Sequence, residues 1–484
     1  MRKGLVLIML GCCPLGTAQS LSPEVRTFVK FDAPVIALLH VRVIDGTGAS
    51  ARQDQTIIIS KGKIDSIGDA STNVPKDAQV LDLHGYTVIP GLVGMHDHMF
   101  YPAGNAIFHE MAISFPRLYL AGGVTTIRTT GSVEPYMDLA LKKQIERGEV
   151  PGPHIHVTGP YLEGPGGWAP QMTELKTPEE AVATVNFWAD RGVDNFKAYN
   201  FISRAVLKAA IDAAHQRGLK VTGHLCSIGF REAAELGIDD LEHGISVDTE
   251  FFPGKKPDQC PISSRASMVA VTAELTKVRV GDPPIQEMIR DLVSHHVAVT
   301  STLPVLELFV PGKAPLQQRV LDAMSEEARA HFLERRVRSD LPMQDPKTGE
   351  PRTSPWGASF EQEKEFERTF VKAGGLLLAG EDPTGMGGDL AGFGDQREVE
   401  LLVEAGFTPL EAIHIATFNG AQYLGDLDRI GTIAPGKQAD LVVIKGDPSK
   451  LIQDIENVET VFKDGVGYDS AKLIESVRGL VGIR

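Results

Sequence analysis

His96 and His98 are separated by one residue and directly follow an apolar run that predicts a β-strand. Two histidines at this spacing on an extended chain project from one face, so both imidazoles can reach one metal ion. The spacing alone is weak evidence, because roughly 0.4 such pairs are expected by chance in a chain of this length with 14 histidines. A second pair, His154 and His156, opens a predicted strand instead of ending one, and we interpret it as structural.

Four more residues that suit metal or acid–base chemistry stand at the ends of predicted strands: Lys197, His224, His243 and Asp382. Each alone has an ordinary explanation, such as a core histidine, a lysine reaching solvent or a helix cap. Chance does not place all of them at the same end of successive strands. The set therefore predicts one shared site, whereas His295-His296 precedes its strand and is left out.

The middle of the chain alternates short apolar strands with helical patterns such as 178–191 and 204–217, which is typical of parallel βα units. Eight units favour a closed barrel with its active site beyond the carboxyl ends of the strands. The eight predicted strands are 87–93, 124–128, 155–158, 193–198, 220–223, 240–242, 297–302 and 376–379.

Both chain ends are rich in short strands and turns, notably 35–39, 56–59, 80–83, 439–444 and 458–462. Chain ends often meet, so we expect them to form one small domain. The predicted fold is α/β: a (β/α)8 TIM-like barrel over 91–430, with a small β-sandwich domain built from 30–90 and 431–470.

The first residues predict a secretory signal peptide over 1–18, with a basic start, an apolar run and small residues before the cut. A lipid anchor at Cys12 is a second interpretation. No other stretch could cross a membrane. Removing 1–18 leaves two of the four cysteines, Cys226 and Cys260. They could form one bridge, but we expect two free thiols. The expected location is the periplasm or the medium.

The chain has 484 residues, of which 42% are hydrophobic and 23% charged, and this composition excludes a disordered or multi-span membrane protein. Its formal net charge of -15 and the lack of a lysine- or arginine-rich run argue against a nucleic-acid partner.

The ordered set His96, His98, Lys197, His224, His243 and Asp382 resembles that of the amidohydrolase superfamily. The segments 88–93 and 431–441 resemble the family's entry into the barrel and its return to the β domain. Lys197 and His224 in their local sequences look most like the imidazolonepropionase-like branch, with its secreted Xaa-Pro dipeptidases and ochratoxin-type amidases. The family usually has a small residue at position 381, where this chain has a glutamate that could reshape the pocket or add a carboxylate near the metals.

The resemblance implies two divalent metal ions, expected to be zinc, bridged by a CO2-derived carbamate on Lys197. His96, His98 and Asp382 would hold one ion, and His224 and His243 the other. A metal-bridging hydroxide would attack the carbonyl, with Asp382 as proton acceptor. Tyr199 would stabilise the oxyanion or bind a substrate carboxylate, or else pack at the barrel rim.

Two long connections, 246–285 and 304–370, are expected over the barrel mouth. Within the second, 326–340 predicts a solvated helix, although its arginines would also suit an anionic substrate end. The glycine-rich stretch 162–168 lacks the residues of a phosphate-binding loop.

The sequence thus predicts an exported metal-dependent hydrolase that cuts an amide bond in an Xaa-Pro-type dipeptide or an N-acyl amino acid. The alternative keeps the metal site but cuts lactones, aryl esters or phosphotriesters. A metal- or ligand-binding protein is the non-enzymatic reading, and it does not explain an acid–base Asp382. The substrate, the metal and any homo-oligomer stay open.

Overall fold

The computed structural model describes residues 21–167, 169–344 and 348–482. The predicted signal peptide, 1–18, and Trp168 of the glycine-rich stretch lie outside the described residues. No helix within the described ranges is long and apolar enough to cross a bilayer.

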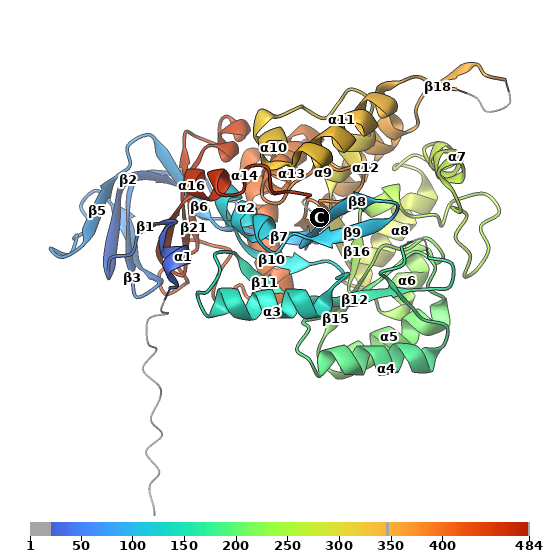
Figure 1. Cartoon of the computed structure of the whole chain (residues 1–484), viewed down its shortest axis with the longest axis horizontal. Coiled ribbons are helices and arrows are strands. Elements are labelled where there is room, and N and C mark those ends of the chain that lie inside the picture. The colour runs from blue at the N-terminus through green and yellow to red at the C-terminus, as the bar shows by residue number, and fades with distance from the viewer. Residues whose placement is uncertain (1–20, 168, 345–347, 483–484) are drawn as a thin grey trace, which may run out of the picture.

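The two ends of the chain meet in one sheet of nine strands (Figure 1). Its order is β1-β23-β22-β21-β6-β2-β3-β4, with β5 paired to β2, and apolar side chains from both ends share one core. The strands are β1 Val29–Phe31, β2 Val35–Val43, β3 Arg52–Ser60, β4 Lys63–Asp69, β5 Gln79–Asp82, β6 Tyr86–Pro90, β21 Leu441–Lys445, β22 Val458–Lys463 and β23 Val466–Asp469.

Parallel strands occupy the middle of the chain in the orders β11-β10-β7 and β12-β14-β15-β16-β17-β20, with β13 (Thr173–Glu174) beside β12. Backbone hydrogen bonds connect the two groups at both edges: Ser132 N–H donates to Gly159 at 3.1 Å, and Asp382 N–H donates to His96 at 2.9 Å. The bounds are β7 Leu92–Asp97, β10 Val124–Thr129, β11 His154–His156, β12 Thr158–Glu163, β14 Asn195–Ala198, β15 Lys220–Gly223, β16 Asp240–Glu242, β17 Ala298–Ser301 and β20 Leu377–Ala379.

Helices lie between successive parallel strands and cover them, which confirms the α/β class (Figure 1). In α5, Ser203 caps the start by accepting from the Val206 N–H, and Leu207, Ile211 and Ala214 recur on the buried face. The helices are α1 Pro23–Arg26, α2 Ser114–Gly122, α3 Pro135–Glu146, α4 Pro178–Ala189, α5 Arg204–Gln216, α6 Phe230–Leu236, α7 Arg265–Leu275, α8 Pro283–Ser294, α9 Leu303–Phe309, α10 Gln318–Ala323, α11 Glu326–Asp340, α12 Trp356–Lys372, α13 Phe393–Ala405, α14 Pro409–His414, α15 Gly420–Leu424 and α16 Ser470–Glu475.

The predicted first strand, 87–93, is wrong as one element, because the chain divides it at Gly91. Its first half is β6 in the nine-stranded sheet, and its second half opens β7 among the parallel strands. The Gly91 N–H donates to Asp440, next to β21. A Cβ at this position would lie 2.0 Å from Thr125 Oγ1, so glycine allows the chain to pass from one sheet to the other.

The predicted third strand, 155–158, is also divided, at Val157. β11 pairs with β10, whereas β12 pairs with β14. Asp194 satisfies the backbone at this change of partner: its carboxylate accepts from the Val157 N–H, and its own N–H donates to the Val157 carbonyl. Strands 220–223 and 240–242 match β15 and β16.

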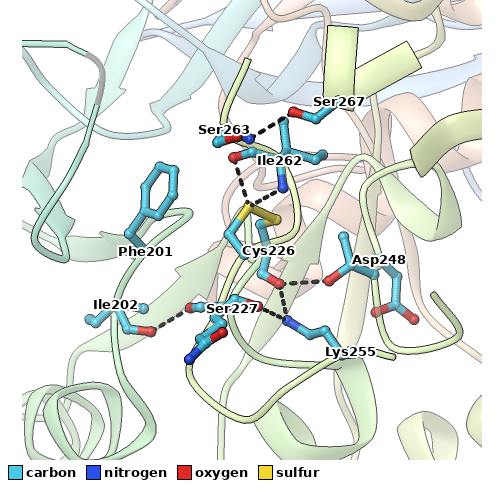
Figure 2. Close-up of a disulfide and its surroundings, with 12 residues drawn as sticks. Phe201, Ile202, Cys226, Ser227, Asp248, Lys255, Ile262, Ser263 and Ser267 are labelled. Atoms are coloured by element: carbon cyan, nitrogen blue, oxygen red, sulfur yellow. Dashed lines mark hydrogen bonds between the residues drawn. A yellow bond between two sulfur atoms is a disulfide. The ribbon is translucent and has the colours of Figure 1, made fainter. Parts of the chain in front are cut away.

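The expectation of free thiols is wrong, because Cys226 and Cys260 form a disulfide (Figure 2). The chain between them leaves β16 and returns over the end of β15, which brings the two Cα atoms within 4.9 Å. Lys255, from the same connection, donates to the Cys226 carbonyl. Sequence separation said nothing about this return, so the pairing could not be inferred from the two cysteines alone.

Candidate active site

All six predicted ligands line one cavity of about 520 Å³ at the carboxyl ends of the parallel strands. His96 lies in β7 and His98 just after it; Lys197 lies in β14. His224 and His243 directly follow β15 and β16, and Asp382 follows β20 after two residues. The convergence of residues that span 286 positions is the geometry that the strand-end pattern predicted.

The side chains face one another at short range. Asp382 carboxylate oxygens lie 3.4 Å from His98 Nε2 and 3.9 Å from the Nε2 atoms of both His96 and His243. Lys197 Nζ lies 3.3 Å from His96 Nε2. The ring of His224 lies 4.5 Å from that of His243, between centroids. The imidazole nitrogens therefore surround a common space next to one carboxylate and one amine.

Three of the histidines have a fixed partner at Nδ1, which leaves Nε2 for the cavity. His96 Nδ1 lies 2.6 Å from Glu242, His98 Nδ1 lies 3.2 Å from the Gly131 carbonyl, and His243 Nδ1 lies 2.7 Å from the Thr302 hydroxyl. Partners of this kind set the tautomer and the direction of metal-binding imidazoles. Glu242 and Thr302 were missed as positioning residues, although Glu242 stands directly before His243 in the sequence.

Burial keeps these imidazoles neutral. It lowers the pKa of His96 and His243 well below the ordinary value, and lowers that of His224 to about 3; the Lys197 charge adds to the shift of His96 and His224. Burial alone would raise the pKa of Asp382, but His96, His98 and Lys197 hold it well below its usual range. Neutral imidazoles with a charged carboxylate form a donor set that suits zinc or a similar divalent ion.

Lys197 is only 1% exposed, and burial lowers the pKa of its amine to about 8. The carboxylates of Glu242, Asp382 and Asp240 oppose that shift. Glu242 and Asp240 also bind the buried Arg128, at 3.0 and 2.8 Å. The amine is therefore closer to its neutral form than an exposed lysine, and only a neutral amine can combine with CO2.

The backbone at two of these residues is strained. His243 and Asp382 have φ values of 64° and 61°, in the left-handed region that residues other than glycine rarely adopt. Such conformations persist where the surrounding structure enforces them, and they gather at functional sites. At both positions the strand has just ended, and the turn directs the side chain inward over the strand ends.

Both long connections line the cavity, as predicted. The first contributes residues of α7, such as Met268, and the second contributes Phe309, Trp356 and Phe360. The hairpin of β8 (Phe100–Gly104) and β9 (Ile107–Glu110), which the sequence analysis missed, adds Phe100 and Phe108. The walls are thus mainly apolar around a polar floor.

Two arginines interrupt the apolar wall. Arg335 and Arg265 line the cavity, and neither forms a salt bridge to a described residue. Burial and the neighbouring Arg265 lower the pKa of Arg335. Helix α11 spans 326–340 as predicted, and most of its arginines bind elsewhere, but Arg335 departs from the solvated-helix interpretation because it faces the cavity.

Tyr199 lines the cavity, where its ring lies 4.8 Å from that of His224 and 5.1 Å from that of Tyr161. Tyr161, which the sequence analysis missed, places its hydroxyl 3.5 Å from His98 Nε2. Tyr161 follows the predicted third strand, so an extension of that strand would have exposed it as a candidate.

Glu381 does not add a carboxylate to the cavity, which corrects one expectation. It is fully buried on the other side of β20, where its carboxylate accepts from the Asp395 N–H at the start of α13. The turn after β20, in which Asp382 adopts its left-handed conformation, directs the two neighbouring side chains to different sides.

The two other histidine pairs lie outside the cavity. His154 and His156 bind Asp464 and Asp426 at 3.2 and 2.9 Å, in line with the structural interpretation. His295 and His296 are exposed after α8.

The amidohydrolase family profile matches residues 87–276 and 371–467, more than half of the chain, so the chain belongs to the amidohydrolase family. A dihydroorotase from Pelotomaculum thermopropionicum is 26% identical over 413 residues, covering 83% of this chain and 86% of its own. An imidazolonepropionase from Vibrio cholerae is 30% identical over 20% of this chain and 25% of its own length.

Solved structures share the fold. A Xaa-Pro dipeptidase with bound methionine superposes with a TM-score of 0.65 at 20% identity, covering 90% of this chain and all of its own. The A. niger ochratoxinase superposes with a TM-score of 0.62 at 18% identity, covering 91% and 96%. The resemblance inferred from the strand-end residues is confirmed, and the chain is a hydrolase of the class that acts on amide and peptide bonds.

Proposed function

We propose that this chain is an exported binuclear metal-dependent amidohydrolase that cleaves the amide bond of an Xaa-Pro-type dipeptide or an N-acyl amino acid. The observation that carries the proposal is the floor of the cavity, where four neutral imidazoles, Asp382 and the buried Lys197 converge.

His96, His98 and Asp382 would hold one divalent ion, since their ligand atoms lie within 4.8 Å of one another. His224 and His243 would hold a second, and a carboxylated Lys197 would lie between the two. When bound, two ions of the zinc class activate water near neutral pH and polarise a carbonyl. Asp382 would accept the proton of that water and deliver it to the leaving amine.

The upper cavity supports an amide substrate with an apolar part and an anionic end. Aromatic walls suit an acyl group or apolar side chain, and Arg335 with Arg265 offers charge to a carboxylate. Tyr199 lines the cavity with its ring 4.8 Å from that of His224, and its hydroxyl would donate to the oxyanion. The alternative, hydrolysis of lactones, aryl esters or phosphotriesters, would use the same floor but leave the arginines without a role.

We further propose the domain organisation predicted above: a closed (β/α)8 barrel over 91–430, and a β-sandwich from 30–90 and 431–470. Backbone hydrogen bonds at both edges of the parallel sheets support closure. Export is supported by the Cys226–Cys260 disulfide, because such bonds persist in oxidising compartments. The mass of the mature protein from a periplasmic fraction would locate the cut and reveal any lipid.

The test is hydrolysis of a library of dipeptides and N-acyl amino acids, with zinc and bicarbonate supplied, scored by released amine. We expect turnover that disappears in Lys197→Ala and Asp382→Asn. Arg335→Met should raise KM about tenfold for substrates with a free carboxylate, and leave the carboxamide analogues unchanged. Turnover of lactones or esters alone, with metal bound, would contradict the amidase proposal and favour the alternative.

A further inference from the structure

A second group of acidic residues lies behind the strands that carry the metal-ligand candidates. Asp97, Glu381 and Asp395 place carboxylate oxygens within 4.8 Å of one another, at the start of α13. Asp97 stands between His96 and His98 at the end of β7, where alternation along the strand turns it away from the cavity. Glu381 stands two residues after β20, and its carboxylate accepts from the Asp395 N–H, away from the cavity. Their exposed fractions are 0%, 0% and 6%.

The charges of this group lack partners. Both carboxylate oxygens of Asp97 and one of Glu381 are buried without a hydrogen bond. Within the described residues, no lysine, arginine or histidine forms a salt bridge with Asp97, Glu381 or Asp395. The nearby Arg128 is already bound by Asp240 and Glu242.

Backbone donors satisfy only part of the group. The Asp395 N–H donates to Glu381, and the Gly392 N–H donates to Asp395. A fourth carboxylate, Asp389, is 5% exposed and also has one buried oxygen without a partner. Carboxylates taken out of water at this density need either protons or a cation to offset their charge.

We propose that Asp97, Glu381 and Asp395 bind a hard divalent cation of the Ca²⁺ class, separate from the catalytic metals. The donor set is all oxygen, which such ions prefer over nitrogen or sulfur. The three ligand oxygens lie within 4.8 Å of one another, and this limit is about twice a Ca–O distance of roughly 2.4 Å, so the spacing is compatible with one shared ion. Mg²⁺ fits less well, because it usually keeps several waters and these three carboxylates are buried in protein.

The ion would connect the end of β7, the segment after β20 and the start of α13, and the first two of these carry or adjoin His96, His98 and Asp382. Its proposed role is to brace the strand ends that hold His96, His98 and Asp382. The inference does not depend on the proposed substrate, because it rests on the side of the strands that faces away from the cavity.

The first test measures the metal content of the full-length protein by mass spectrometry, after growth with calcium and exhaustive dialysis. We expect one Ca²⁺ per chain in the wild type and in Asp382→Asn, and none in Glu381→Gln or Asp395→Asn. Glu367→Gln is the matched control, because Glu367 is an equally buried carboxylate outside the group and should leave the calcium in place.

The second test uses the wild type alone, so it does not depend on the folding of a variant. Thermal unfolding with EGTA should have a midpoint at least about 4 °C lower than with millimolar Ca²⁺, because the ion binds only the folded chain. If the wild type contains no calcium and its unfolding midpoint does not shift, the proposal is overturned. The carboxyl groups of Asp97, Glu381 and Asp395 would then be neutralised by protons. Calcium that is lost in Asp382→Asn but kept in Glu381→Gln would also overturn it, since the ion would then lie in the cavity.

Discussion

Two histidine pairs with the same spacing, His96-Asp97-His98 and His154-Ile155-His156, lie on parallel strands of the same protein and do different things. The first ends β7, holds its Nδ1 atoms against fixed partners and turns Nε2 into the cavity. The second forms β11 and faces away from the cavity: His154 Nε2 lies 3.2 Å from an Asp464 carboxylate oxygen, and His156 Nε2 is hydrogen-bonded to Asp426 at 2.9 Å. A pair of this spacing can bind a metal only where the tertiary structure leaves its lone pairs free.

The largest expected difference between the two pairs is in activity. We expect His96→Ala to lower hydrolysis about a thousandfold or more and to lower bound zinc, because metal activation of water contributes several kcal/mol. His154→Ala, the matched control, should stay within about fivefold of wild type. Steady-state kinetics and metal analysis of both variants check this, and equal losses would erase the distinction between the pairs.

The cavity that contains the first pair is lined by a connection that the Cys226–Cys260 disulfide closes, whereas the second pair lies outside this cavity. Replacing both Cys226 and Cys260 with serine should lower the free energy of unfolding by about 3–4 kcal/mol, from the chain entropy of a 34-residue loop. Denaturant titration of wild type and variant measures it. Reducing agent should lower the free energy of unfolding of the wild type toward that of the variant, and leave that of the variant unchanged. A wild type whose stability is insensitive to reduction would contradict the stabilising role of the disulfide.

The fixed Nδ1 partners are the third distinction. Thr302→Val removes the hydroxyl 2.7 Å from His243 Nδ1, so zinc affinity should fall about 10- to 100-fold. Thr302→Ser keeps the hydroxyl and should restore the affinity. Competition with a chelator provides the measurement. If valine and serine behave alike, the hydrogen bond from this hydroxyl does not set the zinc affinity.

The smallest expected effect is on the stability of the fold at low pH, through the contact between His156 of the second pair and Asp426. Burial raises the pKa of Asp426, but hydrogen bonds from His156 and Arg429 outweigh it and lower the pKa to about 2. Because the pKa of Asp426 is lower in the folded chain than in the unfolded chain, where it is about 4, the ionised carboxylate stabilises the fold at pH values above about 4. This stabilisation is lost as the pH falls toward 2. Because Asp426 is partly hydrated, we expect His156→Ala to remove only about 1 kcal/mol of it. The free energy of unfolding of wild type and His156→Ala, measured from pH 2 to 6, tests this. An identical dependence on pH in the two proteins would show that the contact with His156 does not contribute.

Local patterns were enough for most elements. Strands 220–223 and 240–242 and helix 326–340 match the structure, because runs of apolar residues and helix periodicity are local properties. Strands 87–93 and 155–158 were wrong as single elements, since Gly91 and Val157 mark a change of pairing partner that no local pattern records.

By itself, the sequence determined the family, the α/β class and the six residues of the cavity floor, because the carboxyl ends of parallel strands converge wherever such units pack side by side. Only the tertiary structure decided which side each neighbour faces, that Cys226 meets Cys260, and that Arg335, Tyr161 and Thr302 reach the site. These contacts join residues far apart in the chain, and packing rather than sequence spacing sets their distances.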